Sequence, residues 1–194
     1  MKINNVNVYG LNESVVASGY PFRTEIGNFT CATDKDYNRA IKLGNAKLGS
    51  GHSQFLLGII VQFDLTLPLK VWTEAQRYHF LDFVSSCSTM HCITKFDIKR
   101  QCNEYVFDET INKLQSLCNL YNNTEDKSSD YAKDLYLKIL YNIPSGFELT
   151  ARMTTNYMQL KTIYTQRCQH RLPDWREFCK WIETLPHFKE LCLE

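Results

Sequence analysis

The alternation of apolar and polar residues at the start of the chain predicts a β-strand. Residues 3–9 read Ile-Asn-Asn-Val-Asn-Val-Tyr, and a loop follows at Gly10. A second strand is predicted over 54–65, where β-branched and aromatic residues make the run apolar almost throughout. Such a run is typical of a strand that is covered on both faces, and Gly58 within it predicts a bulge or a close backbone approach. Pro68 ends this strand.

Helical spacing of apolar residues predicts most of the remaining structure. We expect helices over residues 34–48, 71–84, 108–121, 129–142 and 154–166, and a last helix that starts near Pro173. Ser129 is a candidate N-cap, and Pro173 suits the first turn of its helix. Residues 85–91 are small and polar, which predicts a loop that places hydroxyl and amide groups on a ligand.

Length and composition describe an ordinary globular chain. The length of 194 residues favours a single domain, 1–194, and the sequence shows no internal repeats. A composition of 44% hydrophobic and 22% charged residues is that of a folded globular protein and excludes a chain that is disordered as a whole. The chain holds 11 Tyr, 11 Phe and 3 Trp, which suit a core, an oligomer interface or a surface that stacks on a planar ligand. Composition does not separate these three uses.

The charge balance excludes several classes of partner. There are 22 Lys and Arg against 21 Asp and Glu, so bulk nucleic-acid binding and polybasic membrane binding are not expected. The best apolar stretch, 55–61, is too short to cross a bilayer, and the first residues lack the apolar core of a signal peptide. We therefore expect a cytoplasmic protein whose eight cysteines are reduced thiols.

Candidate metal, nucleophile and phosphate-loop motifs are weak. A zinc site drawn from Cys87, His91, Cys92 and Cys102 lacks a second close ligand pair, and buried cysteines that act as small hydrophobes explain them better. We therefore expect no metal. Cys87 and Ser88 lie near His91 only in sequence, which does not specify a covalent nucleophile. Residues 49–51 lack the lysine and the spacing of a phosphate-binding loop.

A basic segment near the C-terminus is more informative. Guanidinium groups match phosphate oxygens, so Arg167 is a candidate phosphate ligand. A solvated basic helix face explains the same pattern, and periodicity alone favours that explanation. The polar and basic residues of the segment are Arg152, Asn156, Lys161, Arg167, His170, Arg171 and Arg176.

Two stretches of the chain together resemble the flavin-dependent thymidylate synthases, the ThyX family. The first stretch runs from Gly51-His52-Ser53 through Pro68 to Tyr78-His79-Phe80, Ser85 and Ser88. Its beginning is similar to the family's Gly-His element. Its end is similar to the family's Arg-His-Arg-x-x-Ser-x-Asn-x-x-Ser-x-Arg signature, whose His falls on His79 and whose later Ser falls on Ser88. The second is Asn156-Tyr157-Met158-Gln159-Leu160 followed by Arg167, which resembles the family's Asn-x-Arg-x-Leu helix. The resemblance covers about residues 50–92 and 150–182.

The departures from the family pattern concern its cations. Tyr78 and Phe80 replace the two signature arginines, Met90 replaces the closing arginine, and Met158 replaces the arginine of the late helix. Phe83 and Ser85 stand where the signature has its first Ser and its Asn. In the family these arginines help to bind the flavin and deoxyuridylate, so their loss weakens phosphate binding unless Arg77 or Lys70 substitutes in part.

The resemblance implies an α+β fold in which helices surround a mainly antiparallel sheet, assembled as a homotetramer with active sites shared between subunits. It implies a pyrimidine deoxynucleotide as ligand, with Arg167 at the phosphate and Ser85, Ser88 and Asn156 in contact with the nucleotide. His79 would line the site, with His52 and Arg77 in support, and the catalytic residues stay unassigned. The resemblance implies FAD as a cofactor, although the absence of the signature arginines argues against FAD binding. For an active enzyme it also implies reduced nicotinamide and methylene-tetrahydrofolate.

Three hypotheses follow. The chain is an enzyme that transfers a one-carbon unit to deoxyuridylate, a methyltransferase of the thymidylate synthase kind, which requires fixed donors around the pyrimidine. Alternatively, it is a non-catalytic protein on the same scaffold that binds a nucleotide or a partner protein, a kind that fits a viral or phage genome. The third hypothesis is an unrelated α+β domain, because fold and motif echoes do not carry function with them.

Overall fold

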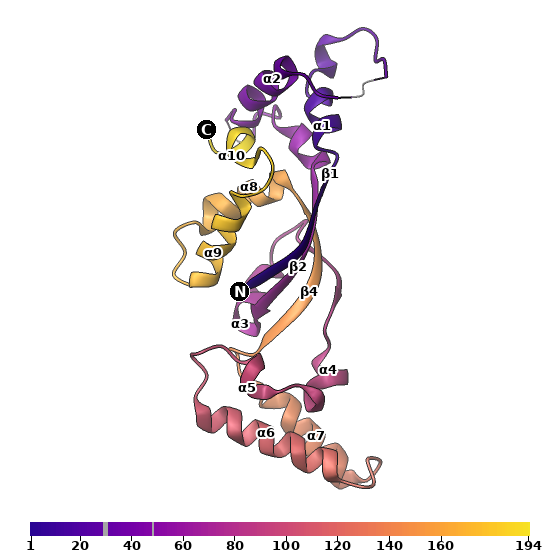
Figure 1. Cartoon of the computed structure of the whole chain (residues 1–194), viewed down its shortest axis with the longest axis vertical. Coiled ribbons are helices and arrows are strands. Elements are labelled where there is room, and N and C mark those ends of the chain that lie inside the picture. The colour runs from indigo at the N-terminus through magenta and orange to yellow at the C-terminus, as the bar shows by residue number, and fades with distance from the viewer. Residues whose placement is uncertain (29–30, 48) are drawn as a thin grey trace.

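A four-stranded antiparallel sheet forms the centre of the computed structural model, which describes residues 1–28, 31–47 and 49–194 (Figure 1). The strands follow the order β1-β2-β4-β3, and each neighbouring pair is antiparallel. Their bounds are β1 Lys2–Tyr9, β2 Ile60–Pro68, β3 Asp82–Ser86 and β4 Glu148–Asn156. The predicted fold class, α+β with a mainly antiparallel sheet and surrounding helices, is confirmed.

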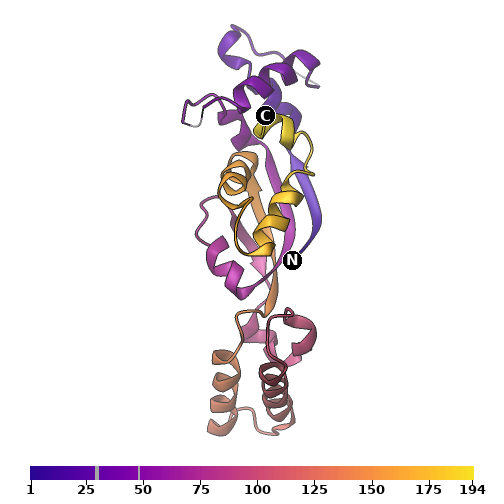
Figure 2. The same ribbon diagram turned by 90° about the vertical axis from the view of Figure 1, so that its left-hand side faces the viewer.

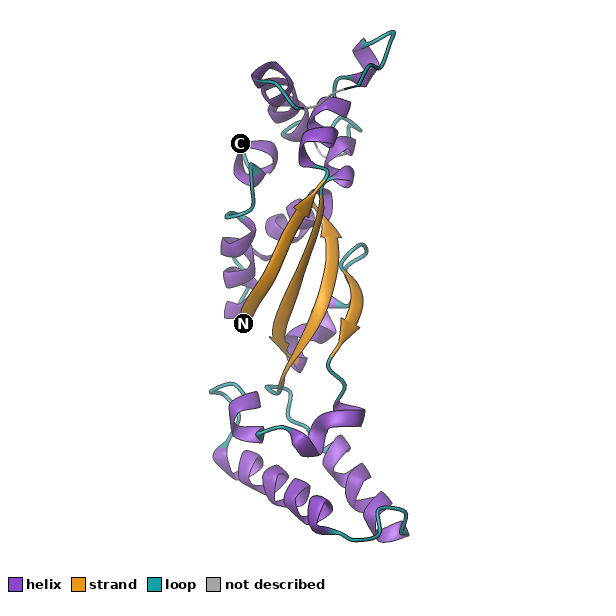
Figure 3. Ribbon diagram, turned by 45° about the vertical axis from the view of Figure 1, so that its right-hand side comes forward, coloured by secondary structure: helices purple, strands orange, loops and turns teal. Residues whose placement is uncertain are grey.

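Helices cover one face of the sheet and extend both of its ends, as Figures 1 and 3 show. The helices on the covered face are α3 (Leu69–Ala75), α8 (Tyr157–Arg167) and α9 (Pro173–Ile182). One end carries α1 (Leu11–Ala17), η1 (Tyr20–Phe22), α2 (Asp34–Gly44), η2 (Gln54–Gly58) and α10 (Phe188–Cys192). The other end carries α4 (Thr89–Cys92), η3 (Ile93–Lys95), α5 (Ile98–Gln101), α6 (Asp108–Asn123) and α7 (Asp130–Tyr141).

The two faces of the sheet differ in polarity because strand side chains alternate. On β2, Val61, Phe63 and Leu65 are fully buried against the covering helices, and Met153 of β4 stands opposite Phe63. The opposite face carries half-buried polar side chains, among them Asp64, whose carboxylate lies 3.2 Å from Nη1 of Arg152. The sheet therefore has one apolar face that helices cover and one polar face.

A second hydrophobic cluster holds α6 and α7 together as a helical pair, seen at the lower end of Figure 2. Its buried members include Ile98, Ile111, Leu114, Cys118 and Ile139. Phe147, just before β4, is fully buried in the same cluster, and Leu149 packs against both clusters. The helical pair is therefore tied to the sheet through the first residues of β4. In the described part of the chain, the helices are all too short or too polar to cross a membrane.

Most of the predicted helices are confirmed, with local signals at their ends. Ser129 caps α7, because its Oγ accepts a hydrogen bond from the amide of Ala132 at 3.2 Å. Pro173 occupies the first turn of α9, as predicted. The helix predicted over 34–48 ends at Gly44, and residue 48 lies outside the described residues.

The strand predicted over 54–65 is wrong in its first half. Gln54–Gly58 form a 3₁₀ helix, and β2 begins only at Ile60. A short apolar run does not distinguish a buried strand from a buried helical turn. The close approach predicted at Gly58 is confirmed, since a Cβ there would lie 2.4 Å from Oγ of Ser14. The prediction that both faces of this strand are covered is also wrong for Gln62 and Asp64, which are half-buried.

The segment from 71 to 91 also departs from the prediction. The helix predicted over 71–84 ends at Ala75, and its last residues belong to strand β3. The predicted loop 85–91 is shorter, since Ser85 and Ser86 close β3 and α4 starts at Thr89. Phe80 adopts a left-handed backbone with φ of 62°, which turns the chain between α3 and β3.

The helix predicted over 154–166 begins three residues late because strand β4 precedes it. Asn156 ends β4 and caps α8, with Oδ1 accepting the amide of Gln159 at 2.9 Å. Strand β4 was not predicted, although it alternates buried residues such as Ala151 and Met153 with half-buried Arg152. The sequence signal for β4 was this alternation, but three threonines in the strand make the apolar and polar positions hard to distinguish.

Candidate functional site

Arg167, the predicted phosphate ligand, ends helix α8 inside a compact cluster. Its Nε donates a hydrogen bond to the hydroxyl of Tyr78 at 2.6 Å, and its Nη1 lies 3.2 Å from Oε2 of Glu74. The guanidinium also lies 4.8 Å from the ring centre of Trp175 and 5.4 Å from that of Tyr78. The side chain is 18% exposed, so two rings and a carboxylate fix its position.

Glu74 is the centre of this cluster. Its Oε2 accepts a hydrogen bond from the indole Nε1 of Trp175 at 3.0 Å, and its Oε1 lies 3.4 Å from Nζ of Lys70. Nε2 of His170 is 3.7 Å away. Burial raises the pKa of Glu74, but hydrogen bonds from Trp175 and Lys70 and the charges of Arg167 and His170 outweigh it and hold this pKa below its usual value. Glu74 is therefore a carboxylate at neutral pH.

Arg77 and His79 lie in the turn that follows α3, on either side of Tyr78. Both are exposed, whereas the hydroxyl of Tyr78 points inward, donates to Oε1 of Gln166 at 3.0 Å and accepts from Arg167. The His79 ring packs against Phe80 with ring centres 4.6 Å apart. This turn presents two polar side chains to solvent beside the Arg167 cluster.

Ser85 and Ser88 belong to the other side of the sheet. Ser85 is exposed on β3, where it pairs with Arg152 of β4. Ser88 is half-buried and occupies the N-cap position of α4. Among the residues that the structure describes, neither serine forms a hydrogen bond with the Arg167 cluster.

Asn156 and His52 lie at the beginning of α8. Asn156 is 7% exposed and its Oδ1 is engaged in the helix cap. His52 is exposed, and Oγ of the neighbouring Ser53 lies 3.9 Å from Sδ of Met158. These two residues are separated from Arg167 by the length of α8, about 16 Å at 1.5 Å per residue.

The seven predicted site residues thus form three groups in one protomer. The first group is Arg167, Arg77 and His79, the second is Asn156 and His52, and the third is Ser85 and Ser88. Ser85 pairs with Arg152, from which strand β4 runs about 13 Å to Asn156. Beyond Ser85, the amide of Cys87 donates to Thr150, from which β4 runs about 20 Å to Asn156. A single nucleotide does not span all three groups within one protomer.

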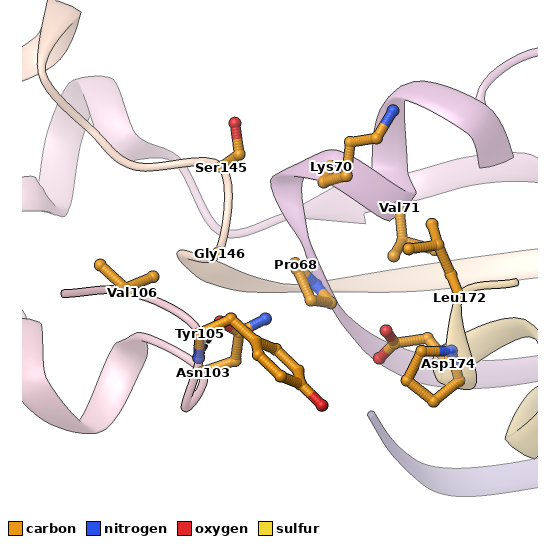
Figure 4. Close-up of a pocket in the computed structure, with 11 residues that line it drawn as sticks. Pro68, Lys70, Val71, Asn103, Tyr105, Val106, Ser145, Gly146, Leu172 and Asp174 are labelled. Atoms are coloured by element: carbon orange, nitrogen blue, oxygen red, sulfur yellow. Dashed lines mark hydrogen bonds between the residues drawn. The ribbon is translucent and has the colours of Figure 1, made fainter.

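The cavity in Figure 4 lies elsewhere, where the sheet joins the helical pair. It measures about 320 Å³, and its walls include Pro68, Val71, Tyr105, Val106, Leu172 and Asp174. Lys70 also lines it and connects it to Glu74. None of the seven predicted site residues contributes to its lining.

The cysteines are free thiols of differing exposure. Among the described residues, no group of three or more His, Cys, Asp or Glu side chains is placed to hold a metal ion. All eight cysteines lie in the described chain as free thiols. Burial, together with the charge of Glu148, raises the pKa of Cys102 to about 11, which opposes its use as a nucleophile or a metal ligand.

Sequence reasoning missed two members of the Arg167 cluster, Glu74 and Trp175. Glu74 lies 93 residues before Arg167, and Trp175 lies 101 residues after Glu74. Only the i,i+4 spacing of Lys70 and Glu74 on α3 was visible in the sequence. That spacing is common on helix surfaces and does not point to a site.

Comparison with known proteins gives a clear result only at the level of structure. No family model matches the chain, and no curated protein matches it. Two crystal structures of the flavin-dependent thymidylate synthase ThyX from Helicobacter pylori, both complexed with FAD and dUMP, are similar over its whole length. The first has a TM-score of 0.75 at 16% identity and covers 100% of both chains. The second has a TM-score of 0.74 at 15% identity and covers 100% of this chain and 98% of the other. The chain therefore has the fold of the flavin-dependent thymidylate synthases.

Proposed function

We propose that this chain binds a pyrimidine deoxynucleotide such as deoxyuridylate. The observation that carries the proposal is the full-length structural similarity to two ThyX structures complexed with FAD and dUMP. Arg167 would be the residue nearest the phosphate, and His79, Ser85, Ser88 and Asn156 would contact the nucleotide. His52 and Arg77, both exposed, would support the site. We place this function in the cytoplasm.

The separation of the site residues supports a shared site. In one chain they form three groups, separated by about 16 Å along α8 and by about 13–20 Å along β4. A homo-oligomer, in our proposal a tetramer, would bring groups from different protomers to one nucleotide. The polar sheet face and the exposed edge strand β3 offer surfaces for such an assembly.

FAD does not fit the residues of one protomer. The pyrophosphate of FAD needs cationic partners. Where the resembling family has arginines, Phe80 and Met90 are apolar and 52% and 58% exposed, and the Tyr78 hydroxyl is already used by Arg167 and Gln166. We therefore derive no step through the flavin. Reduced nicotinamide and methylene-tetrahydrofolate belong only to an active one-carbon transferase.

The proposal has two chemical versions. In the first, the chain is an enzyme that transfers a one-carbon unit to deoxyuridylate, with fixed donors polarising the pyrimidine. In the second, it binds the nucleotide or a partner protein without turnover. Phe80 and Met90 are exposed and apolar at positions where the resembling family has arginines, and this favours binding without turnover.

Deoxyuridylate is expected to stabilise the chain in a thermal-shift titration. A ligand at about 100 times its dissociation constant adds about 2.7 kcal/mol, a shift of several degrees for a chain of this size. Deoxyadenylate serves as the control ligand, and Ser85→Ala should reduce the shift, whereas Ser116→Ala on exposed α6 should not. An additional shift with FAD would support the enzyme, and no shift with deoxyuridylate would refute the proposal.

Assembly is expected to depend on the edge strand β3. Sedimentation velocity should give the mass of a tetramer, and Val84→Lys, at a side chain 58% exposed, should reduce that mass through charge repulsion at the interface. Leu120→Lys on α6, at a side chain 47% exposed, is the matched control. A monomer at all concentrations would contradict the shared site.

A further inference from the structure

The Arg167 guanidinium is already engaged on both of its hydrogen-bonding edges. A guanidinium binds a phosphate best through two parallel N–H groups, either Nη1 with Nη2 or Nε with Nη2. Glu74 lies 3.2 Å from Nη1, and the Tyr78 hydroxyl accepts from Nε at 2.6 Å. Each fork therefore has one of its two nitrogens occupied. A phosphate finds a complete fork only if one of these partners leaves.

Glu74 is not free to leave, because three further groups hold it. The indole of Trp175, whose side chain is only 2% exposed, donates to the same Oε2 that faces Arg167. Lys70 lies 3.4 Å from Oε1 and His170 lies 3.7 Å from Oε2. The carboxylate is 18% exposed and is fixed against Arg167 in the position that an anionic ligand would take.

The charge of the Arg167–Glu74 pair leads to the same conclusion as its geometry. Arg167 and Glu74 form a neutral pair, and the Trp175 ring covers the guanidinium at 4.8 Å. A dianionic phosphate placed beside this pair would meet one cation and one carboxylate, so attraction and repulsion offset each other. Lys70, the second cation of the cluster, is also directed at Glu74.

We infer that Glu74 determines the ligand class of this site: it replaces a 5′-phosphate on Arg167, so the chain binds a pyrimidine deoxynucleoside and its monophosphate with similar affinity. The inference rests on the proposed function, since it specifies which form of the pyrimidine ligand the site selects. Glu74 is a specificity-determining residue that acts through Arg167. The base and sugar then supply the affinity.

Calorimetric titration with deoxyuridine and with deoxyuridylate tests this inference. The wild-type chain should bind the two ligands within about threefold of each other. Glu74→Gln keeps an oxygen for the Trp175 indole but removes the charge, and it should tighten deoxyuridylate binding at least tenfold, on the order of one charge-assisted hydrogen bond, while leaving deoxyuridine unchanged. Glu183→Gln is the matched control, because Glu183 follows the C-terminal end of α9, pairs there with Tyr164 and Lys189, and should change neither affinity.

The outcomes separate this inference from the proposed function. If wild-type chain binds deoxyuridylate more than tenfold tighter than deoxyuridine, Glu74 does not exclude the phosphate and the inference is wrong, while the proposed function stands. That ratio needs no variant, so a Glu74→Gln chain that fails to fold does not prevent the test. If neither pyrimidine binds, inorganic phosphate becomes the probe in a thermal-shift assay. Stabilisation of Glu74→Gln but not of wild type then supports the role of Glu74 and refutes the nucleotide, and stabilisation of neither overturns both.

Discussion

Phe63→Ala is expected to lower the free energy of unfolding by about 3–5 kcal/mol. Phe63 is fully buried on β2, opposite Met153 of β4. Its ring centre lies 4.6 Å from that of Trp181 and 6.0 Å from that of Phe178, both on α9. Alanine at this position would leave a cavity between the sheet and α9, because backbone on both sides prevents collapse.

Urea unfolding followed by tryptophan fluorescence measures the effect, since Trp181 lies in contact with the altered site. Phe22→Ala is the control, because this side chain is 81% exposed and its removal should change stability by less than about 0.5 kcal/mol. A loss below about 1 kcal/mol at Phe63 would mean that α9 does not seal this face of the sheet. If α6 and α7 open independently of the sheet, Phe63→Ala should leave the amide protons of these two helices as protected from hydrogen exchange as they are in the wild-type chain.

Local chemistry explains which elements could be predicted from the sequence. Helices α7 and α9 were predicted because Ser129 and Pro173 mark their starts and because their apolar residues repeat at helical spacing. Strand β1 was predicted from alternation alone. These signals lie within a few residues of one another, so they need no knowledge of the rest of the chain.

Elements that depend on distant partners were missed or misplaced. Strand β3 was divided between a predicted helix and a predicted loop because Asp82–Ser86 have no alternation, and the strand exists through its pairing with β4. Strand β4 itself lies about 65 residues further along, so neither strand signals the other. The fold class was nevertheless correct, because it followed from a resemblance over two stretches, about residues 50–92 and 150–182, rather than from single elements.

The candidate site shows the same division. Arg167 stood out as a cation in a polar segment, and its placement among predicted nucleotide contacts followed from a resemblance. The residues that determine what Arg167 can bind, Glu74 and Trp175, come from α3 and α9 and meet it only in the folded chain. Arg167 could therefore be identified from the sequence, whereas its partner Glu74 could be identified only from the fold.

Gly44→Ala is expected to destabilise the chain although alanine favours helices. Gly44 is the last residue of α2, and a Cβ there would lie 2.1 Å from the carbonyl oxygen of Leu191 in α10. That contact involves backbone, which cannot turn aside as a side chain would. Nζ of Lys161 donates to the carbonyl of Gly44 at 2.6 Å, and Nδ2 of Asn45 donates to the carbonyl of Glu190 at 2.8 Å, so α2 and α10 are fixed in this approach.

Helix propensity alone would make Gly44→Ala stabilising by up to about 1 kcal/mol, so the sign of the change decides between two explanations. Overpacking against the backbone of Leu191 should reverse that gain and leave a net loss of about 1–3 kcal/mol, measured by urea unfolding. Gly27→Ala is the control, because a Cβ at Gly27 meets no atom within 4 Å and should change stability by less than about 0.5 kcal/mol. A more stable Gly44→Ala chain would show that α10 moves away from α2 at little cost, and the close packing of this end of the molecule would then not depend on a glycine.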